Sequence, residues 1–390
     1  MEKNWDLSWI LNHLGEERAQ YRHAVAPPVF QSSIFCFDSV ADMREQLGDE
    51  LANPFYTRGN NPTVEILRRK MAALEGAEDC LIFSSGIAAI SAAVLSCVGQ
   101  GSHVVCVRKP YGWLNKLLGE YLPRFGVETT FVDGREVDNF SRAINERTHL
   151  IYLESPNSLT FELQDIQAVA TLAREKGIAT ICDNSYATPL NQKPIELGVD
   201  MVAHSASKYL NGHSDVVAGV LCASADRIRK IFEGEFMTLG GIISPHDAWL
   251  VIRGLRSLPL RVERVSKTTA EVVTFLEKHP RVSRVYYPMS PSHPQYELAR
   301  RSFRSGGGLF SIDLVADDVA GVERFCDALE RFLMTCSWGG YESLVFPICS
   351  LSSSENYAAK DLPFNLVRIY IGFEEPEVLI ADLDQALSRI

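Results

Sequence analysis

Residues 149–183 read HLIYLESPNSLTFELQDIQAVATLAREKGIATICD, and this stretch is the strongest indication of the fold. Two apolar runs, 149–154 and 178–183, have the length and composition of buried strands, and residues 164–177 between them show helical periodicity. A strand, a helix and a second strand in this order form a crossover unit, whose two strands run parallel. The stretch therefore predicts an α/β fold.

The same alternation continues on both sides of this unit. Further short apolar runs alternate with helical stretches, and they lie at 81–83, 103–107, 200–205 and 216–223. This pattern predicts a large domain, residues 56–250, built on a mostly parallel sheet. The irregular segment before it, residues 1–55, is expected to form an N-terminal arm.

A second, smaller domain is predicted at 251–390. A long helical pattern runs from Ser244 to about His279, with a kink expected at Pro259, and leads into it. The predicted strands of this α/β domain lie at 282–287, 307–315 and 366–372. Its predicted helices lie at 316–332 and 375–390.

The composition narrows the classes of function. The chain has 390 residues, of which 46% are hydrophobic and 22% charged, and its net charge is −11. Nucleic acid requires a basic face, so we expect no nucleic-acid partner. No apolar run is long enough to span a bilayer and the N-terminus lacks a signal-peptide pattern, which predicts no membrane partner and a cytoplasmic location. The nine cysteines form no C-x-x-C pair, so we expect reduced thiols and no metal site.

Lys208 is the first candidate for chemistry, in the run HSASKYLNGHSD at 204–215. It follows a predicted strand, and Ser205 and Ser207 precede it. Two hydroxyls and a lysine at this place can bind a phosphate and set an amine beside it. Burial lowers the pKa of a lysine, which an amine that attacks an aldehyde requires. On its own the motif also fits a lysine in a surface loop.

Other residues extend this candidate site. Asp183 ends the strand 178–183, where open α/β sheets bind ligands, and its carboxylate can pair with a protonated pyridine nitrogen. The run SSGIAAI at 84–90 follows a strand and opens a helix, so Gly86 allows a phosphate to approach free backbone N–H groups. Tyr111 can stack on an aromatic cofactor ring, and Arg58 can bind phosphate. Each residue alone also fits a turn, a helix cap or a surface position; together they point to pyridoxal 5′-phosphate (PLP).

Longer segments resemble a known family in the same order along the chain. These are YTRGNNPT at 56–63, FSSGIAAI at 83–90, HSASKYLNGHSDVVAG at 204–219, RGLRSLPLR at 253–261 and SWGGYESL at 337–344. The set resembles the PLP-dependent enzymes of Cys/Met metabolism, from about Pro27 to the end. The resemblance implies PLP fold-type I.

The resemblance also implies roles for individual residues. Lys208 would hold PLP covalently and move the Cα proton, with Tyr111 stacked on the ring and Asp183 at its nitrogen. Either Lys208 or Tyr111 would be the catalytic residue that protonates the leaving sulfur. The groups that would hold the phosphate are Gly86, Ile87, Ser205 and Ser207. Tyr56 and Arg58 would reach the phosphate of a neighbouring subunit, in a tetramer built from dimers that share active sites. The implied substrate-binding residues are Arg368, which would bind the α-carboxylate, Ser337 and Trp338.

The reaction within the family is less sharply indicated. The run ESPNSLTFE at 154–162 and the run SWGGYESL resemble bacterial cystathionine β-lyases, whereas the front half resembles the γ-enzymes. Trp113 stands where methionine γ-lyases carry cysteine. We therefore expect β-elimination of the amino-acid thioether L-cystathionine to homocysteine, pyruvate and ammonia. The alternatives are a γ-lyase or γ-synthase on the same scaffold, a transaminase, and a PLP-binding regulatory protein without turnover.

Overall fold

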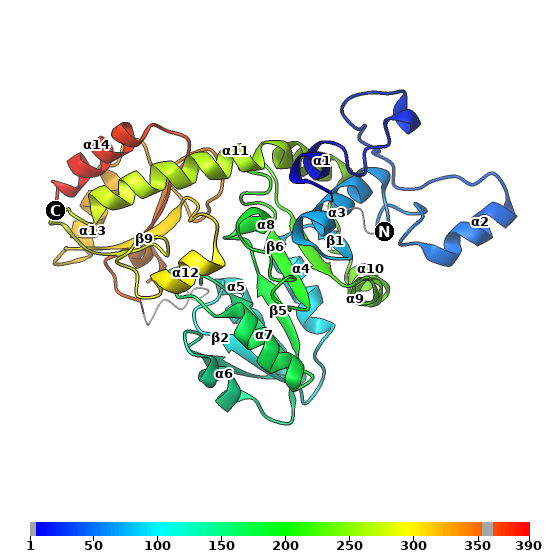
Figure 1. Ribbon diagram of the computed structural model, residues 1–390, viewed down its shortest axis with the longest axis horizontal. Helices are drawn as coiled ribbons and strands as arrows, with labels where there is room; N and C mark the ends of the chain where they lie inside the picture. Colours follow the sequence, from blue (N-terminus) through cyan, green and yellow to red (C-terminus); the bar gives the residue numbers. More distant parts are fainter. Residues whose placement is uncertain (1–4, 353–361) are drawn as a thin grey trace.

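Two β-sheets joined by a long helix form the molecule (Figure 1). The structure, a computed structural model, describes residues 5–352 and 362–390. The joining helix α11, Pro245–Leu276, contains Pro259 and packs against α3 in the first part and α14 in the second. Because α11 crosses the predicted boundary at 250/251, the division into domains stays a proposal.

The larger sheet has seven strands in the order β1-β7-β6-β5-β4-β2-β3. The strands are β1 (Asp79–Phe83), β2 (His103–Val107), β3 (Glu128–Val132), β4 (Thr148–Glu154), β5 (Ala179–Asp183), β6 (Met201–Ser205) and β7 (Gly219–Ala223). Strands β2 to β6 run parallel, and β7 runs antiparallel to both of its neighbours. The predicted mostly parallel sheet is confirmed.

The crossover unit at 149–183 forms as predicted. Helix α7, Ile166–Glu175, connects β4 to β5, and the side chain of Asp165 caps it by accepting from the Ala168 N–H. Its apolar residues recur at helical spacing and are buried. The β4–β5 register pairs Glu154 with Asp183, so two carboxylates end neighbouring strands at the same edge of the sheet.

Helices α3, α4, α6, α7 and α9 contact this sheet. Besides α7, the helices of this part of the chain are α1 (Leu7–Asn12), α2 (Val40–Gln46), α3 (Pro62–Glu75), α4 (Gly86–Leu95), α5 (Gly112–Lys116), α6 (Val137–Ala143), α8 (Thr188–Asn191), α9 (Ala225–Ile231) and α10 (Met237–Leu239). The small residues of α4 let it pack closely on β6 and β7. No helix within 5–352 or 362–390 is long and apolar enough to cross a membrane.

The smaller sheet has five strands in the order β10-β11-β12-β9-β8. Its elements are β8 (Val282–Tyr286), α12 (Tyr296–Ser302), β9 (Leu309–Leu314), α13 (Val319–Asp327), β10 (Leu333–Met334), β11 (Leu344–Pro347), β12 (Leu366–Tyr370) and α14 (Pro376–Leu387). Phe310 and Ile369 of the sheet, Leu276 of α11 and Leu383 of α14 belong to one buried cluster. The three strands and two helices predicted here are present.

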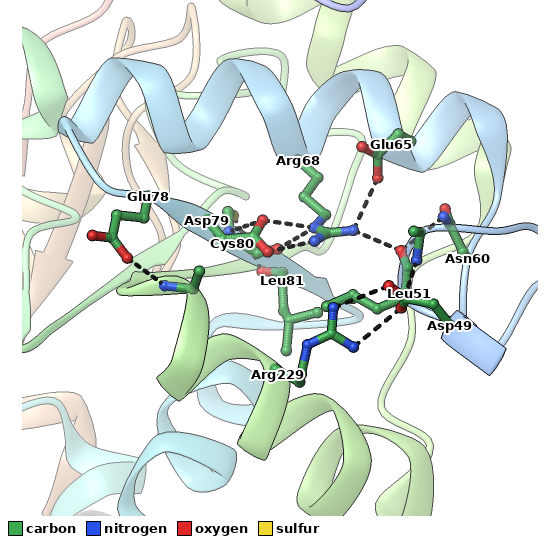
Figure 2. Close-up of polar contacts among 12 residues, drawn as sticks. Asp49, Leu51, Asn60, Glu65, Arg68, Glu78, Asp79, Cys80, Leu81 and Arg229 are labelled. Atoms are coloured by element: carbon green, nitrogen blue, oxygen red, sulfur yellow. Dashed lines mark hydrogen bonds and ion pairs between the residues drawn. The ribbon is translucent and has the colours of Figure 1, made fainter. Parts of the chain in front are cut away.

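The segment before α3 is anchored by arginines (Figure 2). Arg68 of α3 donates to the Leu51 carbonyl at 2.9 Å and to Asp79 Oδ1 of β1 at 2.9 Å. Asn60 also donates to the Leu51 carbonyl, at 2.9 Å, and Arg229 of α9 binds both oxygens of Asp49 at 3.1 Å. Residues 49–60 are therefore tied to the large sheet and its helices.

Candidate active site

A cavity of about 480 Å³ lies at the carboxyl ends of β4, β5 and β6 and is lined by residues from both parts of the chain. All predicted site residues except Tyr56 and Arg58 line it. These lining residues are Tyr111, Gly86, Ile87, Asp183, Ser205, Ser207, Lys208, Ser337, Trp338 and Arg368. Ligands of open α/β sheets bind at such an edge.

Lys208 follows β6 and enters the cavity. Its Nζ donates to Ser337 Oγ at 2.7 Å and lies 5.6 Å from the centroid of the Trp338 ring. Burial, with Arg368 as a second cause, lowers the pKa of Lys208 to about 8. About a tenth of this amine is therefore neutral at pH 7, far more than for a lysine with an ordinary pKa, and the neutral form is the one that a nucleophile or base requires.

Asp183 ends β5 and faces the same cavity. Its Oδ1 accepts the backbone N–H of Ser185 at 2.9 Å, which holds the carboxylate in place. Burial raises the pKa of Asp183, against the hydrogen bonds from Ser185. Because its charge lies in a poorly solvated position, Asp183 is suited to pair with a cationic group of a ligand.

Donors gather where α4 begins. The side chain of Ser85 caps α4 by accepting from the Ala88 N–H, so the N–H groups of Gly86 and Ile87 lack partners within the helix. Ser205 and Ser207 line the cavity beside them. A Cβ on Gly86 would lie 2.9 Å from Ser205 Cβ, so glycine allows this close approach. Amides at a helix start and two hydroxyls suit a phosphate.

Arg368 of β12 supplies a cation from the smaller sheet. It is 8% exposed, donates to the Cys336 carbonyl, and its guanidinium lies 5.1 Å from the centroid of Phe346. Burial lowers the pKa of Arg368 to about 10, which leaves it charged at neutral pH. A guanidinium facing the cavity can bind a carboxylate through two parallel hydrogen bonds.

Trp338 forms part of the cavity wall. Its ring makes an edge contact with Tyr209 at 5.4 Å and lies 6.5 Å from the ring of Tyr186. Neighbouring Gly339 has φ +92, and a Cβ there would lie 2.8 Å from the Lys208 backbone. The run SWGG therefore brings Trp338 and Ser337 close against Lys208.

Tyr56 and Arg58 are not brought to this cavity within one chain. Tyr56 is 42% exposed, and the Arg58 guanidinium lies 5.4 Å from its ring centroid. Neither lines the cavity. Their predicted place in a neighbouring subunit's site stays a prediction.

Two carboxylates of the cavity received no firm role from the sequence. Glu154 ends β4 and accepts the backbone N–H of Tyr111 at 2.7 Å. The sequence did contain an indication of Glu154, because this acid ends the apolar run 149–154 just as Asp183 ends the run 178–183. Glu342 bonds Ser214 through one oxygen, and its buried Oε2 has no hydrogen-bond partner among the described residues.

The residues of the cavity fit PLP. Its aldehyde requires an amine, its pyridine nitrogen a carboxylate, its phosphate several donors and its ring an aromatic face, and the cavity contains groups of each kind. The fold and the site thus define the class of protein, an α/β enzyme of fold-type I that uses PLP.

The family follows from comparison with known proteins. The model of the family described as "Cys/Met metabolism PLP-dependent enzyme" matches residues 10–388. The chain belongs to this family.

Individual relatives cover the full length. L-methionine gamma-lyase of Fusobacterium nucleatum subsp. polymorphum is 37% identical, over 100% of this chain and 99% of that protein. Cystathionine gamma-synthase 1, chloroplastic, of Arabidopsis thaliana is 35% identical, over 97% of this chain and 68% of that protein. The crystal structure of metB from Corynebacterium glutamicum has a TM-score of 0.91 and 32% identity, with 98% of each chain covered.

These names change the expectation about the reaction. The two runs at 154–162 and 337–344 favoured a cystathionine β-lyase, but the relatives above are named γ-lyase and γ-synthase. The names fit the γ-alternative better than the β-reaction. The two short runs supply only some of the residues that line the pocket, whereas the overall similarity reflects the whole chain.

Proposed function

We propose that the protein is a carbon–sulfur lyase that cleaves an amino-acid thioether of the cystathionine type by β-elimination. The observation that carries this proposal is the position of Lys208 Nζ, 2.7 Å from Ser337 Oγ and 5.6 Å from the centroid of the Trp338 ring. Bound PLP supplies the electron sink for the charge left at Cα when a proton is removed. The residues of the chain bind, orient and move protons around it.

Arg368 would orient the substrate. A bidentate bond to the α-carboxylate would fix one end of the amino acid in the cavity that Lys208 also lines, so that Cα would come within reach of the Lys208 amine. Lys208 acts as the general base at Cα, since its lowered pKa of about 8 makes the neutral amine available. The same amine, once protonated, can return its proton to the departing sulfur.

Asp183 and the donors at α4 would hold the cofactor. Asp183 would keep the pyridine nitrogen protonated, which the electron sink requires. Gly86, Ile87, Ser205 and Ser207 would bind the phosphate, and Tyr111 would stack on the ring.

Trp338 supports the choice of β- over γ-elimination. A γ-elimination requires a further proton removal at Cβ, so the base must serve two neighbouring carbons. The centroid of the Trp338 ring lies 5.6 Å from Lys208 Nζ, and the ring contacts Tyr209 and Tyr186. We infer that the ring limits the reach of the amine toward Cβ. A restricted amine favours removal of the Cα proton alone.

Glu342 supports a cystathionine-type substrate. Glu342 lines the cavity, and its buried Oε2 has no hydrogen-bond partner among residues 5–352 and 362–390. A substrate with a second amino group offers a cation to this oxygen. Methionine has no such group at its sulfur end.

The second candidate is γ-elimination or γ-replacement on the same scaffold. The names of the relatives favour it over β-elimination, while the wall around Lys208 favours the first candidate.

The variant Trp338→Leu tests whether Trp338 favours β-elimination. Removing the indole frees space beside Lys208, so the ratio of pyruvate to 2-oxobutyrate from L-cystathionine should fall by about tenfold. Trp338→Phe keeps an aromatic ring and serves as the matched control, with a ratio near that of the wild type. Measuring both keto acids checks this, and an unchanged ratio in Trp338→Leu removes Trp338 as the reason for β-elimination.

A further inference from the structure

A second acid lies beside Asp183. Glu154 ends β4 as Asp183 ends β5, the two are paired in register, and both line the cavity. The Glu154 side chain is deeply buried, with the residue 6% exposed. Two negative charges on neighbouring acids repel each other, and Asp183 is one of the causes that raise the pKa of Glu154.

Glu154 joins three segments of the site through hydrogen bonds. Its Oε2 accepts the backbone N–H of Tyr111 at 2.7 Å, and its Oε1 lies 2.5 Å from Ser158 Oγ. Its backbone N–H donates to Gln164 Oε1 at 3.1 Å. The position of Tyr111 relative to Asp183 therefore depends on this side chain.

The surroundings disfavour a negative charge on Glu154. Burial and then Asp183 raise the pKa of Glu154 to about 8, against hydrogen bonds from Ser158 and the Tyr111 amide. The other titratable groups packed around it are Cys106 of β2, Tyr152 of its own strand and Cys182 of β5. These thiol and phenol groups carry no positive charge that could stabilise an ionised Glu154. The cations that line the cavity are Lys208 and Arg368.

We propose that Glu154 is a positioning residue that carries a proton while the enzyme works, and that as a neutral acid it holds the Tyr111 amide and the Ser158 hydroxyl in place. The carboxyl pair at the ends of β4 and β5 then carries a single negative charge, at Asp183. This inference rests on the proposed roles of Asp183 and Tyr111 toward PLP. It does not depend on whether the reaction is a β- or a γ-elimination.

Two variants separate a neutral acid from an ionised one. In the structure the Ser158 hydroxyl donates to Glu154 Oε1. In Glu154→Gln the amide oxygen can accept the Tyr111 N–H, and the amide nitrogen can donate to Ser158 Oγ once that hydroxyl rotates, as a protonated acid would also require. PLP affinity of the purified protein should stay within about threefold of the wild type. In Glu154→Ala both hydrogen bonds are lost, and affinity should fall by about tenfold or more.

Infrared spectroscopy of the PLP-loaded protein gives a readout that does not need turnover. We expect a protonated-carboxyl band at pH 7 that disappears as the pH rises through about 8 and that is absent in Glu154→Gln. Glu162→Gln is the matched control, because hydrogen bonds from Thr160 and Asn157 and the charge of Lys109 lower the pKa of Glu162, so that variant should keep the band.

The proposal is overturned if Glu154→Gln keeps the band, or if it binds PLP as weakly as Glu154→Ala. If Glu154→Ala does not fold, the comparison of wild type with Glu154→Gln still decides. A protein that shows the band and the pattern of PLP affinities but cleaves no thioether would refute the proposed function and leave this inference standing.

Discussion

Lys208 combines two properties that its neighbours impose on it. Burial and the nearby Arg368 lower the pKa of its amine to about 8, and Ser337 orients it at 2.7 Å. Arg368 belongs to β12 of the smaller sheet and Ser337 to the loop between β10 and β11, and both lie more than 120 positions further along the chain than Lys208. The reactivity of this residue therefore depends on contact between the two parts.

The lowered pKa of Lys208 predicts how cofactor capture depends on pH. The neutral amine attacks the aldehyde, and the neutral fraction increases with pH until it exceeds half at about pH 8. The rate at which PLP-free protein captures PLP should rise between pH 6 and about 8 and level off above. Stopped-flow absorbance of PLP measures this rate of capture. A rate that still rises tenfold per pH unit above pH 9 would mean that the pKa of Lys208 is that of an ordinary lysine.

Single residues were predictable to different extents. Lys208 and Asp183 stand in short motifs after predicted strands, so their place could be predicted. Glu154 was missed although it also ends a strand, because a sequence does not show that the acid accepts the Tyr111 amide. The Trp338 contact with Lys208 depends on a positive φ at Gly339, which no pattern of apolar residues indicates.

At the scale of elements, β7 packs against α4, the helix whose first residues line the site. Gly219 of β7 faces the turn into α4, and a Cβ on Gly219 would lie 2.0 Å from the Ser85 carbonyl oxygen. Backbone atoms cannot give way as a flexible side chain can. The close approach of this strand to the start of α4 therefore requires glycine.

Gly219→Ala should displace the start of α4. We expect a loss of about 1–3 kcal/mol in the free energy of unfolding and weaker PLP binding, because the proposed phosphate site moves. The matched control is Gly234→Ala, where an added Cβ meets nothing within 4 Å. Thermal unfolding and PLP titration measure both; equal behaviour of the two variants would contradict the predicted clash.

Element prediction succeeded where periodicity was strong. The unit β4-α7-β5 and the helices α13 and α14 lie where apolar residues recur at strand or helical spacing. Strands β3, β10 and β11 were not predicted, since β3 is a partly exposed edge strand and β10 has two residues. The antiparallel direction of β7 was also not predicted, because apolar runs do not indicate strand direction.

At the scale of the whole molecule, the site of one chain lacks two predicted residues. Tyr56 and Arg58 lie in the segment that Arg68 and Arg229 tie to the body (Figure 2), and they do not line the cavity. A sequence indicates such residues by resemblance but does not say which copy they serve. We propose that they complete the site of a second copy.

Hybrid dimers test this sharing. Arg58→Ala and Lys208→Ala should each lose most activity, but a hybrid of the two contains one site with both residues intact. Co-expression in equal amounts should restore about a quarter of the wild-type activity. If both residues act within one chain, the mixture would show no more activity than the separate variants.

The most direct test of the account is to identify the keto acid that the purified, PLP-loaded protein releases from L-cystathionine. We predict pyruvate with homocysteine and ammonia, and loss of both turnover and the visible absorbance of bound PLP in Lys208→Ala. Release of 2-oxobutyrate with cysteine would contradict β-elimination and establish the γ-reaction that the relatives' names favour. Release of no keto acid would contradict the assignment as a lyase of cystathionine-type thioethers.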